Sequence, residues 1–452
     1  MRLLVTLSLF LAVVGSLRAD APPLNGTMPE DYLPGLQPLL KEAVERSPNT
    51  ISASISLAQA EAGRYSAAAS LWPQASLSAD YAVARESVTN GVPNTSKGLL
   101  YNASLSQSVF QWGAYRNSKI IGDLSAKIAE RQFAEAYRTL AVIIREQYLG
   151  LIGKKIQMRN AQFALKITQE SMAAQQARFE AGAASQADLG NFRMSVDEAQ
   201  LAADRAADDF AYTKRVFTRL VGIDDLPDDT IPLMVPHPEY SATLADTVLT
   251  GFVGEGIEST FQNQVYQMYL KQQDLTYSIA KVRLLPKVNA AAGYGYSYAT
   301  TVSAGSVSQY GLTAETYSVA ASWNIFDGFA TRGAKLSALA SKRQYERLRQ
   351  SYVDTTIDSI TDMRRQIGFS SRAMSLSEAH HALIDSQVRQ LNQELGLGYA
   401  SQATIDSGVL NLYATEFNMA YARSDYLNHW TEFISLAGVD PALANLPSRY
   451  VR

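Results

Sequence analysis

The chain has 452 residues, with 40 basic and 43 acidic side chains, a net charge of −3 and no cysteine. This balance of charge argues against nucleic acid as a partner, because nucleic-acid-binding proteins present basic surfaces. The lack of cysteine excludes disulfides, thiolate metal sites, a cysteine nucleophile and a lipid anchor on cysteine. The fold must therefore be held together by burial alone.

The segment 1–19 has the pattern of a secretory signal. Arg2 is followed by an apolar stretch from Leu3 to Val14, and Leu17-Arg18-Ala19 precedes a cleavage point before Asp20. The apolar stretch is too short to span a bilayer, and no later run reaches the roughly 18 apolar residues that a membrane helix needs. We expect an exported protein without a transmembrane helix.

Residues 20–35 contain four prolines and predict an extended N-terminal arm. A helix then begins near Leu36, is interrupted at Ser47-Pro48 and resumes from Asn49 to Leu71. Trp72-Pro73 ends it.

Beyond this point the apolar period changes from 3.6 to 2, which predicts one hairpin at about 76–110 and a second at about 288–326. In each hairpin, apolar and aromatic side chains alternate with small polar ones, and the turn of the first lies near residues 89–94. Positions assigned to the apolar-aromatic face are Leu77, Ala79, Tyr81, Val83, Tyr101, Ala103, Leu105, Val109, Val288, Ala290, Ala292, Tyr294, Tyr296, Tyr298, Tyr317, Val319, Ala321, Trp323 and Ile325.

Four such strands of about 10 residues are typical of a membrane β-barrel with a water-filled lumen. The alternative is a pair of soluble hairpins with one half-buried face. Lys and Glu are scarce on the small polar face, where a soluble hairpin would carry them, and this favours the barrel.

Long helical stretches follow each hairpin, and we expect them at Ala114–Ala181, Ser185–Val221, Arg332–Leu397 and Ser401–Ala437. A heptad-like apolar seam, typical of a coiled coil or helix barrel, is formed by Ile120, Leu124, Ile128, Tyr137, Leu140, Ile144, Tyr148 and Leu151. A proline-rich linker, residues 223–240, precedes another helix predicted from Ala242 to Leu284, and residues 439–452 form a C-terminal tail.

From Phe110 to Gly222, the first half returns in the second half at a constant offset of 216 positions, without insertion. Phe110, Ala114 and Arg116 return as Phe326, Ala330 and Arg332, and Phe217, Leu220 and Gly222 return as Phe433, Leu436 and Gly438. A register kept over so many positions predicts two structural repeats, residues 36–222 and 241–438, that form rods of equal length side by side.

Four strands are too few to close a membrane barrel, since the smallest natural ones have about eight. An open sheet edge is not tolerated in lipid, because its backbone groups lack partners there. Either the hairpins lie outside a membrane or several chains share one barrel. Three chains would supply twelve strands.

This doubled order of helix, hairpin and long helix pair resembles the TolC-type outer-membrane efflux proteins over essentially the whole mature chain. The residues that carry the resemblance are Leu71-Trp72-Pro73 and Leu284-Leu285-Pro286 before the hairpins, Phe110 and Phe326 after them with Arg116 and Arg332, and Arg178-Phe179-Glu180-Ala181-Gly182 with Ser185 and Asp188. The resemblance implies a mainly α fold. It also implies a homotrimer whose twelve-stranded outer-membrane barrel continues into a periplasmic α-helical barrel.

The same resemblance implies a function and partners. The protein would sit in outer-membrane lipid of a Gram-negative-type cell, with most of its mass in the periplasm. It would be the exit duct of a tripartite system, for efflux of small molecules or secretion of proteins, with a periplasmic adaptor and an inner-membrane pump. The contrasting interpretation is an exported coiled-coil spacer without a pore.

Two related segments, residues 182–187 and 398–403, are predicted tips between antiparallel helices. Glycine at a helix end and serine at the next N-cap account for part of their composition. The resemblance implies that the tips also dock an adaptor through Gly182, Ala183, Ala184, Ser185, Gln186, Gly398, Tyr399, Ala400, Ser401 and Gln402.

Acids near the tips close the periplasmic mouth in the proteins that this chain resembles. Asp188 is the matching acid of the first repeat, although its place three residues after Ser185 also suits a capping box. The second repeat departs from the pattern, and its nearest acid is Asp406. Arg178 and Glu394 occupy equivalent positions with opposite charge, which suggests a pair across neighbouring hairpins.

The sequence offers nothing for catalysis. The four histidines lack metal-ligand spacing, and there is no phosphate loop, dinucleotide fingerprint or nucleophile elbow. We expect no enzyme activity, no metal and no cofactor.

Overall fold

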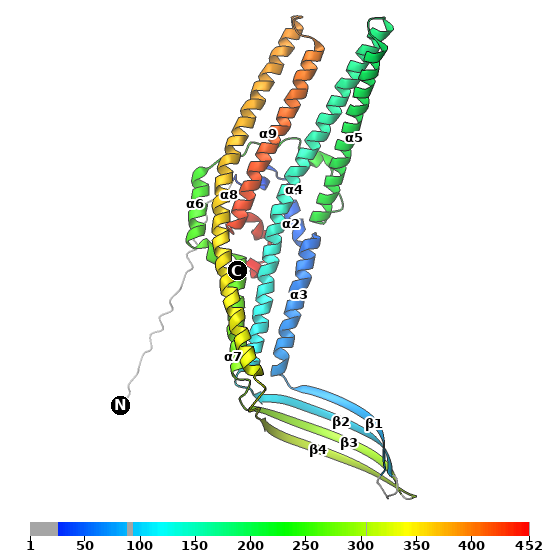
Figure 1. Cartoon of the computed structure of the whole chain (residues 1–452), viewed down its shortest axis with the longest axis vertical. Helices are drawn as coiled ribbons and strands as arrows, with labels where there is room; N and C mark the ends of the chain where they lie inside the picture. Colours follow the sequence, from blue (N-terminus) through cyan, green and yellow to red (C-terminus); the bar gives the residue numbers. More distant parts are fainter. Residues whose placement is uncertain (1–25, 88–93, 304, 452) are drawn as a thin grey trace, which may run out of the picture.

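A computed structural model describes residues 26–87, 94–303 and 305–451; the predicted signal, the start of the arm and most of the first hairpin turn lie outside these ranges. Long helices stand on a four-stranded sheet, with the two helix tips at the far end (Figure 1). The helices are α1 (Pro29–Tyr32), α2 (Leu36–Arg46), α3 (Pro48–Ala68), α4 (Ala114–Glu180), α5 (Gln186–Val221), α6 (Ala242–Gly254), α7 (Phe261–Lys281), α8 (Ala330–Gly396), α9 (Gln402–Leu436) and α10 (Ser448–Val451), and the strands are β1 (Gln74–Glu86), β2 (Asn94–Phe110), β3 (Lys287–Ser303) and β4 (Ser306–Ser322).

The two longest helices, α4 and α8, have 67 residues each and begin at Ala114 and Ala330, which are equivalent positions of the two repeats. At 1.5 Å per residue each is about 100 Å long. The predicted seam of α4 is buried from Leu124 to Leu151, and only Ile120, nearest the sheet, is half-buried. Packing of this seam, rather than intrinsic helix propensity, holds so long a helix in water.

The long helices α3, α4, α5, α7, α8 and α9 form a single layer, and the shorter α2 and α6 pack against it (Figure 1). α4 contacts α3 and α5 on one side and α7 and α9 on the other, and α8 contacts α7 and α9 beyond them. One edge of the layer is therefore α3 with α5, and the opposite edge is α8.

A core at mid-height covers one face of α4; we call it the lateral core. It joins α4 to α2, to the proline-rich linker and to the C-terminal segment, and it includes Leu36, Leu40, Tyr137, Ile144, Ile152, Ile231, Val235 and Leu443. Although it is rich in proline, the linker is thus held in place by its buried Ile231 and Val235.

A buried ion cluster fixes the segments before α2 and after α9 to this core. The Arg145 guanidinium is fully buried and donates to both carboxylate oxygens of Glu30, at 2.9 and 2.6 Å, and of Asp440, at 2.7 and 2.8 Å. Removing one partner would leave a buried charge uncompensated, which typically costs about 3–5 kcal/mol. Arg145 therefore ties the segments before α2 and after α9 to the middle of α4.

The sheet is antiparallel in the order β1-β2-β3-β4, so β1 and β4 are its free edges. Leu77, Ala103, Tyr294 and Glu315 are register partners in turn across all four strands. They therefore share one face, which holds the positions predicted to be apolar and aromatic and which we call the aromatic face. The charged residues on this face are Arg85 and Lys97 near the first hairpin turn and Glu315 in β4.

Three expectations need correction. Residues 29–32 are helical and Met28 and Leu33 are buried, so this part of the predicted arm is not extended; Pro29 at the first helical position favours the turn. The helix predicted over 242–284 breaks between α6 and α7, where Gly254 and Gly256 interrupt it.

The strands also differ from expectation, since they have 13 or 17 residues rather than about 10. Backbone pairing continues past the apolar stretch into polar residues such as Thr300 and Gln309. Trp323 and Ile325, expected in the last strand, lie beyond its end, and the Trp323 indole donates to the Leu284 carbonyl at 3.0 Å.

In the described ranges no helix is both long enough and apolar enough to cross a membrane.

Two equivalent glycines test how closely the end of α5 packs against the backbone between α2 and α3. Gly222 and Gly438 end α5 and α9 with φ of 88° and 73°. A Cβ on Gly222 would lie 2.1 Å from the Arg46 carbonyl oxygen, whereas a Cβ on Gly438 would have no atom within 4 Å. Gly438→Ala should lower stability by about 1–2 kcal/mol, the cost of a left-handed backbone with a side chain. Gly222→Ala should cost clearly more, because the α2–α3 backbone must move.

The midpoint of thermal unfolding, monitored by circular dichroism in detergent, measures the stability of both variants. Equal shifts of the midpoint would contradict this account of Gly222.

Candidate functional sites at the helix tips and along the helix layer

The first tip joins α4 to α5 through residues 181–185. Gly182 has φ of 76°, as expected for the residue that ends a helix. The Ser185 hydroxyl accepts from the Asp188 backbone N–H at 3.1 Å, and the Asp188 carboxylate accepts from the Ser185 N–H at 3.2 Å and from its hydroxyl at 2.7 Å. These bonds form a capping box, so Asp188 has a structural role at the tip.

The second tip joins α8 to α9 and lacks a carboxylate at the corresponding place. The Ser401 hydroxyl accepts from the Thr404 N–H at 3.2 Å, and the two hydroxyls lie 2.8 Å apart. This tip presents Tyr399, which is 83% exposed, and the exposed Leu397 beside it. The second tip is therefore the more apolar of the two.

The charged residues predicted to form a gate bind locally within one chain. Glu394 accepts from Gln390 at 2.8 Å, and Asp406 accepts from Gln402 at 2.8 Å. In the described part of the chain no ion pair joins Arg178 to Glu394, although Arg178 helps to lower the pKa of Asp188. A pair across hairpins of neighbouring chains stays a prediction.

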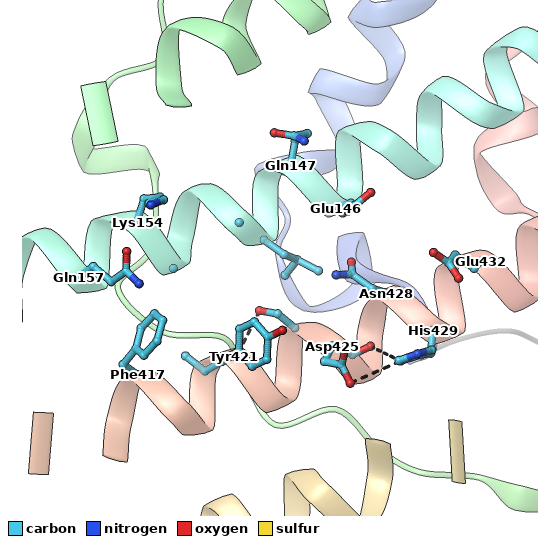
Figure 2. Close-up of a pocket in the computed structure, with 15 residues that line it drawn as sticks. Glu146, Gln147, Lys154, Gln157, Phe417, Tyr421, Asp425, Asn428, His429 and Glu432 are labelled. Carbon is cyan, nitrogen blue, oxygen red and sulfur yellow. Dashed lines mark hydrogen bonds and ion pairs between the residues drawn. The ribbon is translucent and has the colours of Figure 1, made fainter. Parts of the chain in front are cut away.

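A groove between α4 and α9, which sequence reasoning missed, has a volume of about 500 Å³ (Figure 2). The groove stays open because Gly150, Gly153 and Ala420 contribute little or no side chain to fill it. Most lining positions of α4, such as Glu146, Gly150, Gly153 and Gln157, recur every three or four residues and lie on the face opposite the lateral core, whereas Leu149 belongs to both. One face of α4 is thus packed and the other is open.

Aromatic and acidic groups occupy opposite ends of this groove (Figure 2). Phe417 and Tyr421 lie toward the tips, and Glu146, Asp425 and Glu432 lie toward the sheet. Partial burial raises the pKa of Glu432, and the charges of Glu146 and Asp425 add to the rise, while His429 opposes it.

His429 is held by its own helix and does not complete a metal site. Its Nδ1 lies 2.8 Å from the Asp425 carbonyl oxygen, so that nitrogen donates, and 3.5 Å from the Asp425 carboxylate. Across residues 26–87, 94–303 and 305–451, no group of three His, Asp or Glu side chains could hold a metal ion.

The two edges of the helix layer carry exposed apolar stripes. On α8, Phe369, Leu376 and Leu383 are exposed and spaced by seven residues, which places them in one line along the helix. On α5, Met194, Leu201, Tyr212 and Val216 form a similar exposed line. The heptad spacing was present in the sequence and would have identified the α8 stripe.

Both the sequence and the fold of this chain are similar to those of known proteins. The sequence matches the outer membrane efflux protein family over residues 39–222, which include α3, the first hairpin, α4 and α5. The fold is similar to that of the Campylobacter jejuni CmeC outer membrane channel, with a TM-score of 0.69 and 15% identity over 92% of this chain and 89% of that chain. The chain has the fold of the TolC-type outer-membrane efflux proteins.

Other channels with this TolC-type fold are similar to the same extent. The outer-membrane channel OprN matches with a TM-score of 0.70 and 15% identity, over 93% of this chain and 94% of that chain. The open state of the Neisseria gonorrhoeae MtrE channel matches with a TM-score of 0.65 and 15% identity, over 89% and 88%. No curated protein matches the sequence.

The capping box predicts that the stability of the first tip depends on pH. Hydrogen bonds from the Ser185 hydroxyl and N–H lower the pKa of Asp188 below its usual value, with a further contribution from Arg178. Because the folded pKa lies below the unfolded value of about 3.9, this contribution to stability is complete above that pH and is lost as the pH falls through the folded pKa.

Pepsin cleavage at the two tips, compared across the acid range, measures the effect. The ratio of first-tip to second-tip cleavage should rise as the pH falls in the natural protein and should be high and flat in Asp188→Asn. The second tip, with Thr404, is the internal control. A ratio that does not change with pH in the natural protein would contradict the prediction.

Proposed function

We propose that three copies of this chain form an outer-membrane duct through which a tripartite export system releases its cargo. The observation that carries the proposal is that the free edges of the sheet and of the helix layer coincide. α3 leads directly into the edge strand β1, and the edge strand β4 leads into α8. A rotation that places β4 of one copy beside β1 of the next would therefore also place α8 of the first copy beside α3 and α5 of the second.

The sheet needs this closure if it lies in lipid. β1 and β4 each present a row of backbone donors and acceptors that no strand within residues 26–87, 94–303 and 305–451 pairs. Such groups must be paired in a bilayer, and pairing β4 of one copy with β1 of the next satisfies them. Three copies give twelve strands, which is enough for a barrel.

Internal symmetry supports the same closure of the helices. Within the chain, Phe417 of α9 lies over Gly153 of α4, with 3.9 Å between its ring and a Cβ built on the glycine. The equivalent positions of the other repeat are Leu201 of α5 and Phe369 of α8, and each is 51% exposed. The α4–α9 contact thus has a counterpart, α8 against α5, that only a second copy can complete.

The proposed ring gives the two faces of α4 different surroundings. The lateral core would lie outside as a belt, and the groove with Glu146 and Glu432 would line the passage. A wide, polar passage suits small-molecule efflux or protein secretion, with energy supplied by an inner-membrane pump.

The tips are proposed to dock the periplasmic adaptor and to gate the mouth. The second tip supports this, because Leu397 and Tyr399 are exposed in a segment that needs only its glycine and serine for capping. Asp188, Arg178, Glu394 and Asp406 lie near the tips, where a change in hairpin spacing would alter their contacts.

A charge placed in the α8 stripe should prevent assembly without unfolding the chain. Leu376 is 73% exposed in the single chain, so Leu376→Glu should leave helix content unchanged. It should nevertheless abolish the trimer, because the carboxylate would be buried against α5 of the next copy. Val253→Glu, at an exposed apolar position of α6, is the matched control and should leave the trimer intact.

Native mass measurement of the detergent-extracted protein reports the outcome. Trimers of Leu376→Glu would refute the α8–α5 contact. Monomers of the natural protein, soluble without detergent, would favour the spacer interpretation.

A photo-crosslinking residue at Gln402 should capture the adaptor in living cells. We expect an adduct heavier than the trimer from Gln402, and none from the same residue at Glu170, which is exposed on α4 away from the tip. Adducts at both positions or at neither would contradict tip-specific docking.

A further inference from the structure

The second hairpin repeats the first, but the offset in residue number from β1 to β3 differs from the offset from β2 to β4. β2 and β4 follow the general offset of the repeats, in which Phe110 returns as Phe326. Trp72-Pro73 before β1 returns as Leu285-Pro286 before β3, which is an offset shorter by three positions. The structure obeys both offsets, because the partners Leu77 and Ala103 of the first hairpin become Ala290 and Val319, which are partners in the second. The hairpins therefore have the same internal register.

The junction between the hairpins also has a defined register. Within the chain, β2 pairs with β3 so that Tyr101 lies opposite Tyr296 and Leu99 lies opposite Tyr298. In a ring of identical copies, the equivalent junction joins β4 of one copy to β1 of the next. The same two offsets then place Tyr317 opposite Val83 and Glu315 opposite Arg85.

We infer that β4 of one copy pairs with β1 of the neighbouring copy in this register, so that Glu315 forms an ion pair with Arg85 across the subunit junction. The inference rests on the proposed ring, and it adds the register and the contact that specify it. The partner is a second copy of this chain.

Charge complementarity at the two free edges supports the pair. Glu315 is the only charged residue of β4, and Arg85 is the only basic residue of β1. Both are exposed, and neither has an ion pair or side-chain hydrogen bond among the residues that the structure describes. An isolated carboxylate among the tyrosines of the aromatic face would be costly in lipid, and an opposite charge beside it reduces that cost.

The pair also selects one register. A slip by one residue would move the aromatic face of β4 to the other side of the sheet. A slip by two would keep the faces but would set Glu315 against Val83 or Ser87 and leave both charges without a partner. Among these registers, only the one copied from the β2–β3 junction keeps the aromatic residues on one face and also pairs the two charges.

Introduced cysteines test the register directly, since the chain has none of its own. The double variant Tyr317→Cys with Val83→Cys should give a covalent trimer in outer membranes under mild oxidation, because directly opposite residues lie within disulfide reach. The matched controls, Tyr317→Cys with Tyr81→Cys and Val319→Cys with Val83→Cys, are displaced by two residues. They should crosslink about tenfold less.

Charge exchange tests the ion pair. Glu315→Arg and Arg85→Glu should each reduce the yield of trimer about tenfold, because like charges then face each other in a membrane setting. The double exchange should restore most of the yield. Failure of the double exchange to restore it, with crosslinking at a displaced pair, would overturn the inference.

Native mass of the same preparations separates this inference from the proposed function. A natural protein that is trimeric but crosslinks in another register refutes the register alone. A natural protein that is monomeric refutes the ring, and the register with it.

Discussion

The pairing of backbone groups at the two free edges of the sheet is the constraint on which the rest of this structure depends. A four-stranded sheet cannot close on itself, and in the part of the chain that the structure describes the outward N–H and C=O groups of β1 and β4 have no partner strand. Closure by other copies requires that the helices above the sheet meet at the same edges. That requirement accounts for two 67-residue helices at equivalent positions of the repeats and for apolar stripes on α5 and α8 that would be unfavourable in a monomer.

One face of the helix layer is packed against a core, and the other face is open. The lateral core buries one side of α4, and Arg145 fixes the N-terminal and C-terminal segments to it through Glu30 and Asp440. The opposite side stays open because Gly150 and Gly153 carry no side chain to fill the groove against α9. In the proposed ring, the packed face would lie outside and the unfilled face inside, which suits a passive duct.

Much of this architecture could be predicted from the sequence because duplication repeats each signal. The period-2 stretches, the helix ends at Gly182 and Gly398, and the seam of α4 all rest on local periodicity or capping, and the structure contains each of them. Features that depend on tertiary context could not be read in this way, such as the burial of Val235 and the groove. At the strand exits, Trp112-Gly113 and Gly328-Phe329 all have positive φ, so each repeat places one aromatic residue in a left-handed conformation that its sequence alone does not predict.

Electron cryomicroscopy of the detergent-extracted protein, with a native mass on the same sample, tests the central claim most directly. The account predicts particles of three chains with threefold symmetry and a continuous lumen, a helical part about 100 Å long and a twelve-stranded barrel at one end. β4 of each copy should lie beside β1 of the next, with Phe369 near Leu201 of the neighbouring copy. A monomer, or an assembly in which β1 and β4 stay unpaired, would contradict it.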